Sequence, residues 1–261
     1  MQTNVCRKSR SFVPRALFVG FYDVHPSRVP GNPCYEGVSG SSAQRGRTVL
    51  VWDLPTRLFH WLTVTLMLAA YITWRIDWVN WHALVGEALL ALVLFRIVWG
   101  FVGSDTARFA RFLASPYVAI RYLARLFRRE PDMQVGHNPA GGWMVLLLLA
   151  LLLGETLTGI VDNNDVADEG PLTHAVPAMV LNLITDLHRL LWDALLAAAV
   201  LHVMAISIYA VAKGQNLLRP MLTGRKQLPD QTTPPRVTSL VLAGVVLGGS
   251  AAAVALLATF L

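Results

Sequence analysis

The sequence predicts an all-α integral membrane protein, built as a four-helix transmembrane bundle with a fifth, C-terminal transmembrane helix. Of its 261 residues, 54% are hydrophobic and only 15% are charged, whereas soluble domains carry about 25% charged residues. Five segments are apolar and approach the roughly 20 residues that a helix needs to cross a bilayer. Eight tryptophans agree with this class, because Trp collects at membrane–water interfaces.

Helix-start signals precede two of the five spans. Asp53 is a typical N-cap residue with Pro55 close behind it, and Asn138 is followed directly by Pro139. Asp and Asn accept hydrogen bonds from the first free N–H groups of a helix, and Pro fits its first position. The fifth span is rich in small residues, which allow helices to pack closely in lipid. In chain order the predicted spans are residues 58–74, 82–102, 143–161, 187–211 and 240–261.

The distribution of basic residues predicts the orientation in the membrane. Short cytoplasmic loops carry an excess of Lys and Arg. Basic residues are frequent before the first span, between the second and third spans, and after the fourth. By contrast, only Arg75 lies between the first two spans, and residues 162–186 contain five acidic residues and no Lys or Arg. We therefore expect a multi-pass protein of the bacterial inner membrane with a cytoplasmic N-terminus and a periplasmic C-terminus.

The formal net charge of +6 does not indicate a nucleic-acid partner, because the basic residues follow the predicted cytoplasmic loops. Residues 108–129 hold six arginines, three of them at helical spacing. This pattern predicts an amphipathic helix lying on the anionic lipid of the inner leaflet. Cys6 and Cys34 form no C-x-x-C-H motif, so covalent attachment of a c-type haem is not supported.

Four of the seven histidines lie inside or at the edge of the predicted spans. His60 is near the cytoplasmic side of the first span and His82 opens the second span on the outer side. The fourth span carries His188 at its outer end and His202 deeper inside. Fourteen residues advance a helix by about 21 Å and almost four turns, so these two histidines share a face. Each then has one partner at its own depth: His82 for His188, and His60 for His202.

Two imidazole pairs at two depths predict two haems, an outer one held by His82 and His188 and an inner one held by His60 and His202. An iron with two axial histidines has no open position, so it relays electrons. A zinc site would gather its ligands at one depth, and a di-iron site would need Glu-x-x-His pairs, which the membrane glutamates lack. The alternative for any single histidine is a hydrogen bond between helices.

Arg96 is the main supporting residue of the predicted inner haem site. It follows His82 by fourteen residues, so it lies on the same helix face at the inner depth. A buried Arg needs an anionic partner, and a propionate of the inner haem is a candidate. The alternative is an Arg that reaches the inner headgroups. His137, in the inner loop, is a lesser candidate ligand or a contact to quinone or haem propionate, and His174, in the outer loop, is the one substitute for a named ligand.

Several motifs together resemble the family of bacterial cytochrome b561 and the cytochrome b subunit of nickel–iron hydrogenases. The resemblance covers about residues 48–226. It implies a four-helix membrane bundle with two b-type haems, and the family's ligand positions match His60, His82, His188 and His202. The motifs are VWDLPTRLFHWL, HALVGEALLALVLFRIVWG, GHNPAGGWMVLLLLALL, the His-x13-His of the fourth span, and NLLRPMLTG.

The resemblance also implies electron exchange with the quinone pool and with a partner protein. We expect transmembrane electron transfer between quinone and a periplasmic redox partner such as a c-type cytochrome, docked by acidic residues within 162–169. One alternative is the membrane anchor and electron-acceptor subunit of a nickel–iron hydrogenase. A second is a haem-free membrane scaffold or transporter. The sequence leaves open whether the chain is itself a quinone oxidoreductase.

The sequence predicts four segments along the chain. Residues 1–47 are polar and without periodicity, and we expect them to be disordered or to be upstream sequence included by a wrong start codon. Residues 48–226 form the di-haem four-helix membrane domain. Residues 227–239 form a linker, and residues 240–261 form the additional transmembrane helix.

Overall fold

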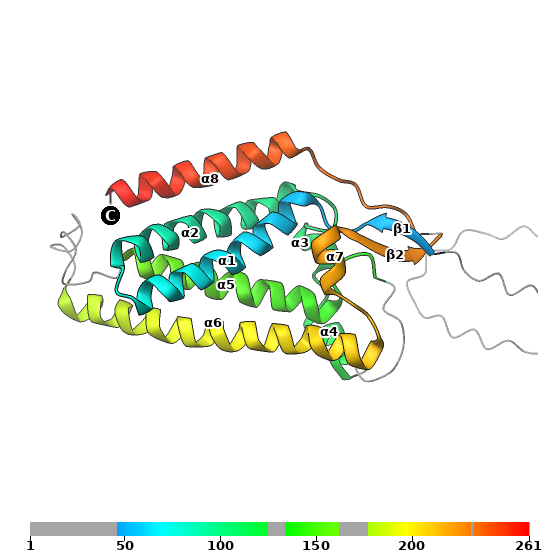
Figure 1. The fold of residues 1–261 in the computed structure, drawn as a ribbon, viewed down its shortest axis with the longest axis horizontal. Helices are drawn as coiled ribbons and strands as arrows, with labels where there is room; N and C mark the ends of the chain where they lie inside the picture. The colour runs from blue at the N-terminus through cyan, green and yellow to red at the C-terminus, as the bar shows by residue number, and fades with distance from the viewer. Residues whose placement is uncertain (1–45, 125–133, 162–176, 231, 261) are drawn as a thin grey trace, which may run out of the picture. The chain divides into compact units, whose positions relative to one another are not determined.

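The computed structural model describes residues 46–124, 134–161, 177–230 and 232–260, all within the second of two compact units, residues 44–261. The expectation for the N-terminal segment therefore lies outside the described residues, apart from its last two positions. In chain order (Figure 1) the elements are β1 (Gly46–Leu50), α1 (Leu54–Arg75), α2 (Val79–Val102), α3 (Phe109–Phe112), α4 (Pro116–Ala124), α5 (Pro139–Val161), α6 (Ala178–Lys213), α7 (Leu218–Thr223), β2 (Arg225–Pro229) and α8 (Leu240–Phe260).

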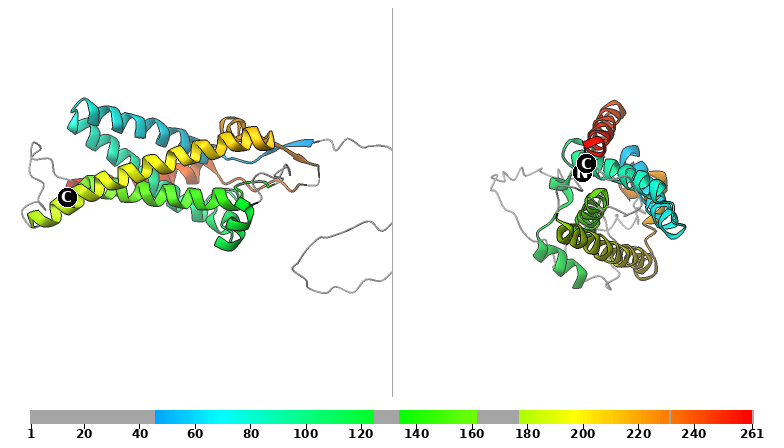
Figure 2. Two further views of the ribbon diagram at one scale, coloured as in Figure 1. Left: turned by 90° about the horizontal axis from the view of Figure 1, so that it is seen from below. Right: turned by 90° about the vertical axis from the view of Figure 1, so that its left-hand side faces the viewer.

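Four long helices form the bundle, and the fifth lies outside it. α1 packs on α2, α2 on α5, and α5 on α6, while α8 packs on the free side of α2. Figure 2 shows α8 apart from the other four helices, next to α2. The pairs α1–α6 and α2–α6 are not among the closely packed ones in the described part of the chain. The predicted four-helix bundle with an extra C-terminal helix is confirmed.

The membrane character of the helices agrees with the predicted class. By length and composition, α2, α5, α6 and α8 are each apolar enough to cross a bilayer. α1 has 22 residues but is less apolar than the other four, because Arg57, His60 and several threonines interrupt it. α2 contributes the most buried face, with Leu90 and Val93 almost inaccessible. Large apolar side chains elsewhere point outwards, as expected where lipid is the solvent.

A two-stranded ribbon connects the two ends of the bundle domain. β1 pairs antiparallel with β2 in a register that sets Gly46 opposite Pro229. Gly224 precedes β2 with φ 78°, and its carbonyl accepts from the N–H groups of Val51 and Trp52. The ribbon was not predicted, because its strands are far apart in the sequence and have no local turn. The proposed linker at 227–239 consequently begins with three residues that belong to a strand.

α6 is longer than the predicted fourth span. It has 36 residues, which extend over about 54 Å, compared with a hydrocarbon layer of about 30 Å. Nothing between Pro177 and Gly214 breaks the helix, and it ends at Gly214, which has φ 62°. The sequence prediction began at Leu187 because the polar residues before it lower the hydropathy without interrupting helix formation.

The predicted amphipathic helix at 108–129 is divided in the structure. α3 and α4 are separated by residues 113–115, because the residue before a proline, here Pro116, avoids the helical region. Residues 125–133 lie outside the described chain. α4 is tied to the bundle by a short network: Asn138 Nδ2 donates to the Tyr209 hydroxyl at 2.9 Å, which donates to the Tyr122 hydroxyl at 2.7 Å.

Candidate functional site

Two histidines from different helices face each other at one level of the bundle. His82 lies on α2 and His188 on α6, with ring centres 6.5 Å apart and ring planes at 86°. Nδ1 of His82 lies 2.9 Å from the Ala70 carbonyl of α1. A carbonyl oxygen only accepts, so Nδ1 carries the proton and Nε2 keeps its lone pair for a metal.

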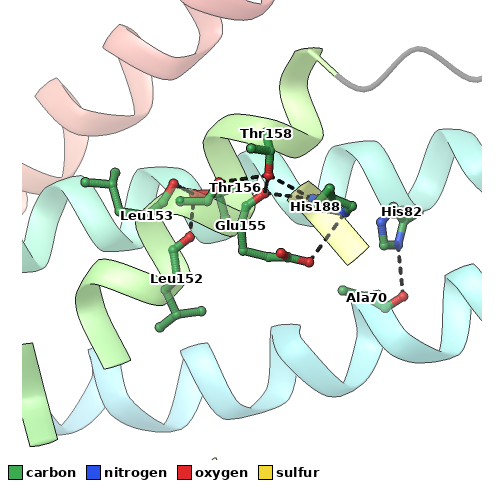
Figure 3. Close-up of polar contacts among 9 residues, drawn as sticks. Ala70, His82, Leu152, Leu153, Glu155, Thr156, Thr158 and His188 are labelled. Atoms are coloured by element: carbon green, nitrogen blue, oxygen red, sulfur yellow. Dashed lines mark hydrogen bonds and ion pairs between the residues drawn. The ribbon is translucent and has the colours of Figure 1, made fainter. Parts of the chain in front are cut away.

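The second ring of this pair is held by α5. Nδ1 of His188 lies 3.0 Å from the Glu155 carbonyl oxygen and 3.1 Å from the Thr158 hydroxyl, as Figure 3 shows. The Thr158 hydroxyl itself donates to the Gly154 carbonyl at 2.8 Å, so it accepts from His188. Nε2 of His188 lies 3.4 Å from the Glu155 carboxylate. Both rings of the outer pair therefore have their Nδ1–H groups fixed by oxygen acceptors.

The other two predicted ligands form a second pair. His60 lies on α1 and His202 on α6, with ring centres 6.5 Å apart and ring planes at 53°. The edge of Trp61 lies against His60, with ring centres 5.0 Å apart. Nδ1 of His60 is buried and has no hydrogen-bond partner among the described residues. Because α6 is one continuous helix, the two pairs are separated by about 21 Å along its axis.

The four histidines fit a group with an iron at its centre. A metal about 2.0–2.1 Å from two imidazole nitrogens, each about 1.2 Å in front of its ring centre, separates the ring centres by about 6.5 Å. Both pairs have this separation. In each pair, one histidine lies on α6 and the other on a helix that does not pack closely against α6. The axes of directly packed helices lie 8–10 Å apart, so the helices of each pair are further apart than that. A Cβ at Gly86, one turn after His82, would meet nothing within 4 Å, which leaves space for a flat macrocycle.

Arg96 is buried inside the protein. Only 2% of it is exposed, and its Cζ lies 5.2 Å from the ring centre of Phe109. Its Nη1 is buried and has no hydrogen-bond partner in the described chain. The buried Asp53 carboxylate is a counter-charge close to Arg96, and the unsatisfied Nη1 leaves one donor for a further anion on this side of the bundle.

His137 lies just before α5, enclosed by α3 and by the residues before α1, in a more buried place than the sequence indicated. Its ring contacts Trp52 and Phe112, with ring centres 4.5 Å and 4.6 Å away. Burial, aided by the positive charge of Arg96, lowers the pKa of His137 to about 3, so the imidazole is neutral at physiological pH. Its buried Nδ1 has no partner among the residues described. His174 and the acidic residues at 162–169 lie outside the described chain.

Sequence reasoning missed the residues that hold the ligand rings. Thr158, the Glu155 carbonyl and the Ala70 carbonyl are not visible as a motif. Gly159 also belongs to this group, because a Cβ there would lie 3.0 Å from Cε1 of His188. A glycine beside a threonine in an otherwise apolar span was the available signal.

Comparison with known proteins agrees with this geometry. The model of the prokaryotic cytochrome b561 family matches residues 51–224, which include the four histidines and Arg96. A probable Ni/Fe-hydrogenase B-type cytochrome subunit of Bradyrhizobium diazoefficiens is 25% identical over 74% of this chain and 91% of its own length. The subunit of the same name from Rhizobium leguminosarum bv. viciae is 21% identical over 74% of this chain and 94% of its own. No solved structure matches the chain significantly.

Proposed function

Because this chain belongs to the prokaryotic cytochrome b561 family, a family of membrane b-type cytochromes, we propose that it carries electrons across the bacterial inner membrane through two haems. The observation that carries the proposal is the pair of facing imidazoles at each of two levels, with ring centres 6.5 Å apart in both. His82 and His188 hold the outer haem, and His60 and His202 hold the inner haem. The N-terminus is cytoplasmic and the C-terminus periplasmic, as the basic loops predict.

The protein's own residues prepare the imidazoles for this role. A haem iron with two axial histidines supplies one-electron transfer without binding a substrate. The Ala70 carbonyl orients His82, and the Glu155 carbonyl with the Thr158 hydroxyl orients His188. Such outer hydrogen bonds fix the tautomer and raise the basicity of a ligand. On the inner side, Arg96 binds a haem propionate with its buried guanidinium.

The close packing of Gly159 against His188 allows a first test of the proposed role of His188 as a haem ligand. In Gly159→Ala the new methyl group approaches Cε1 of His188 at 3.0 Å, so the ring must move by a few tenths of an ångström. We expect Gly159→Ala to lower the haem-to-protein ratio from two towards one. In the matched variant Gly154→Ala the methyl group meets the end of Leu191 at 3.2 Å, a flexible side chain. Equal haem loss in both variants would contradict the proposed role of His188.

An apolar pocket on the inner half of the bundle supports a quinone as one redox partner. The pocket has a volume of about 420 Å³ and is lined by α2, α3 and α5, including Phe109, Leu149 and Ala150. Phe109 also lies against Arg96, the residue proposed to bind a propionate of the inner haem. Pockets of this size and polarity suit the apolar part of a small ligand.

Filling this pocket is expected to slow exchange with quinone. Ala150→Phe places a bulky ring in the pocket and changes no proposed ligand. The rate of haem reduction by a short-chain quinol should fall at least tenfold, while the amount of haem reduced by dithionite stays constant. The matched variant Ala197→Phe adds the same bulk at an alanine of α6 that is exposed like Ala150 but does not line the pocket, and it should leave the quinol rate unchanged. Equal rates of haem reduction in the two variants would contradict quinone binding in this pocket.

The partner on the outer side is proposed to be a nickel–iron hydrogenase, because the relatives are named as hydrogenase cytochrome subunits. Oxidation of H2 releases two protons and two electrons, and a quinone takes up two electrons and two protons to become a quinol. The chain passes these electrons one at a time. A periplasmic c-type cytochrome is the second candidate, favoured by the acidic segment 162–169, which would steer a basic protein by charge.

A reduction experiment distinguishes the partners and tests the function. Membranes containing this chain are treated with H2, with reduced c-type cytochrome, or with quinol, and the b-type haem absorption is followed. Reduction by H2 in membranes that hold the hydrogenase, and not in membranes without it, supports the first partner. Reduction by the c-type cytochrome, lost after Asp162, Asp165, Asp168 and Glu169 are neutralised, supports the second. Absence of b-type haem bands would refute the proposed function.

A further inference from the structure

The two imidazole pairs differ in the hydrogen bonds of Nδ1, the ring nitrogen that is not assigned to the iron. In the outer pair, Nδ1 of His82 lies 2.9 Å from the Ala70 carbonyl, and Nδ1 of His188 lies within 3.1 Å of two oxygens of α5. In the inner pair, Nδ1 of His60 is buried without a partner in the described part of the chain. A hydrogen bond from Nδ1 to an oxygen makes Nε2 a stronger donor to a metal. Both outer ligands are therefore stronger donors than His60.

The charged side chains near the two pairs also differ, and this difference again lowers the reduction potential of the outer haem relative to the inner one. The Glu155 carboxylate lies 3.4 Å from Nε2 of His188 and its side chain is only 12% exposed. On the inner side, the buried guanidinium of Arg96 lies close to the buried carboxylate of Asp53, so the two charges offset each other. A stronger donor and a carboxylate both favour the more positive, oxidised iron of the outer haem, whereas a charge pair favours neither state strongly.

We propose that Thr158 and the Glu155 carbonyl, by accepting from His188, hold the outer haem at a lower reduction potential than the inner haem. The inference rests on the proposed function and adds to it a residue that positions an outer ligand. With the lower potential on the outer side, an electron would pass spontaneously from the outer haem to the inner one, as a periplasmic donor and an inner quinone require.

Thr158 is a positioning residue, and the chain offers a matched control for it. Thr156, two residues away on α5, has a buried hydroxyl that donates only to the helix carbonyls of Leu152 and Leu153. Both threonines bond back to their own helix, but only Thr158 contacts a histidine (Figure 3). Val has nearly the same shape as Thr and lacks the hydroxyl. Comparing Thr158→Val with Thr156→Val therefore isolates the hydrogen bond to His188.

The test is a redox titration of both haems in the full-length protein, followed by their visible absorption. The wild-type chain should show two components. Thr158→Val should raise the midpoint potential of the lower-potential component alone. The expected change is about threefold in the equilibrium constant for reduction of that haem, which is about 28 mV at about 59 mV per tenfold change. Thr158→Ser, which restores a hydroxyl, should return that component to its original midpoint, and Thr156→Val should move neither.

The outcomes separate this inference from the proposed function. If wild-type membranes hold no b-type haem, the proposed function is wrong. If two haems are present but Thr158→Val shifts the higher-potential component, the order of potentials is wrong; if it shifts neither component, the role of the Thr158 hydroxyl is wrong. Neither result contradicts the proposed function. If Thr158→Val loses a haem, the component that disappears must be the lower-potential one, and loss of the other component overturns the inference.

Discussion

Replacing His202 with Ala is expected to remove the inner haem and to spare the outer one. His202 is paired with His60 only, with ring centres 6.5 Å apart, and it lies about 21 Å along α6 from His188. The alanine variant leaves one axial imidazole on the inner side, and the haem-to-protein ratio should fall from two to one. Haem extracted from the purified protein and counted per chain measures this directly.

Two further variants test whether the haem loss expected for His202→Ala is specific to the proposed inner pair. His137→Ala removes another buried imidazole of the inner side, one that is not a proposed ligand, and should leave both haems bound. His188→Ala should remove the haem that His202→Ala retains. The two single-haem proteins must then differ in spectrum or midpoint potential. If both variants retain the same haem, the assignment of the pairs is wrong.

Replacing Arg96 with Met is expected to weaken the inner haem strongly. Arg96 is 2% exposed and its Nη1 has no hydrogen-bond partner in the described chain, so a propionate would satisfy a buried charge. Truncating one partner of a buried charge pair costs about 2–5 kcal/mol, which corresponds to a loss of affinity of more than tenfold. Haem occupancy after dilution or competition with a haem-binding protein measures the change.

The same variant should affect the haem-free protein differently. Without a propionate, Arg96 keeps the attraction of Asp53 and its contact with Phe109 but has an unsatisfied Nη1, so Arg96→Met should lower the thermal midpoint of the haem-free chain less than that of the loaded chain. Arg111→Met is the matched control, because Arg111 has an exposed guanidinium 3.7 Å from the Asp105 carboxylate and should retain both haems. Equal destabilisation of the loaded and haem-free forms would assign Arg96 a purely structural role.

The sequence predicted the helices and their partners because those features have local or periodic signals. Apolar runs of bilayer length located the spans, and Asn138 caps α5 as expected, accepting from the Gly141 N–H at 2.7 Å. The structure also places His60 beside His202 and His82 beside His188, as the fourteen-residue spacing indicated. That these pairs bind haem stays a prediction of the proposed function.

Other features could not be predicted from a single sequence because they depend on contacts between distant residues. β1 and β2 pair across about 180 residues of chain, so neither strand has a nearby turn to identify it. The acceptors of the ligand histidines include backbone carbonyls, at Ala70 and Glu155, and every residue type has a carbonyl. The burial of His137 likewise follows from the way α3 and residues before α1 enclose the inner loop, and not from its own neighbours.

The amount of haem b per chain is the measurement that tests the central claim most directly. The purified full-length protein is analysed for haem and for protein, and its reduced-minus-oxidised spectrum is recorded during a redox titration. Two facing pairs of histidines predict two haems per chain and two one-electron components. A ratio of one would leave one pair without its proposed role, and the absence of b-type haem would contradict the function proposed for this chain.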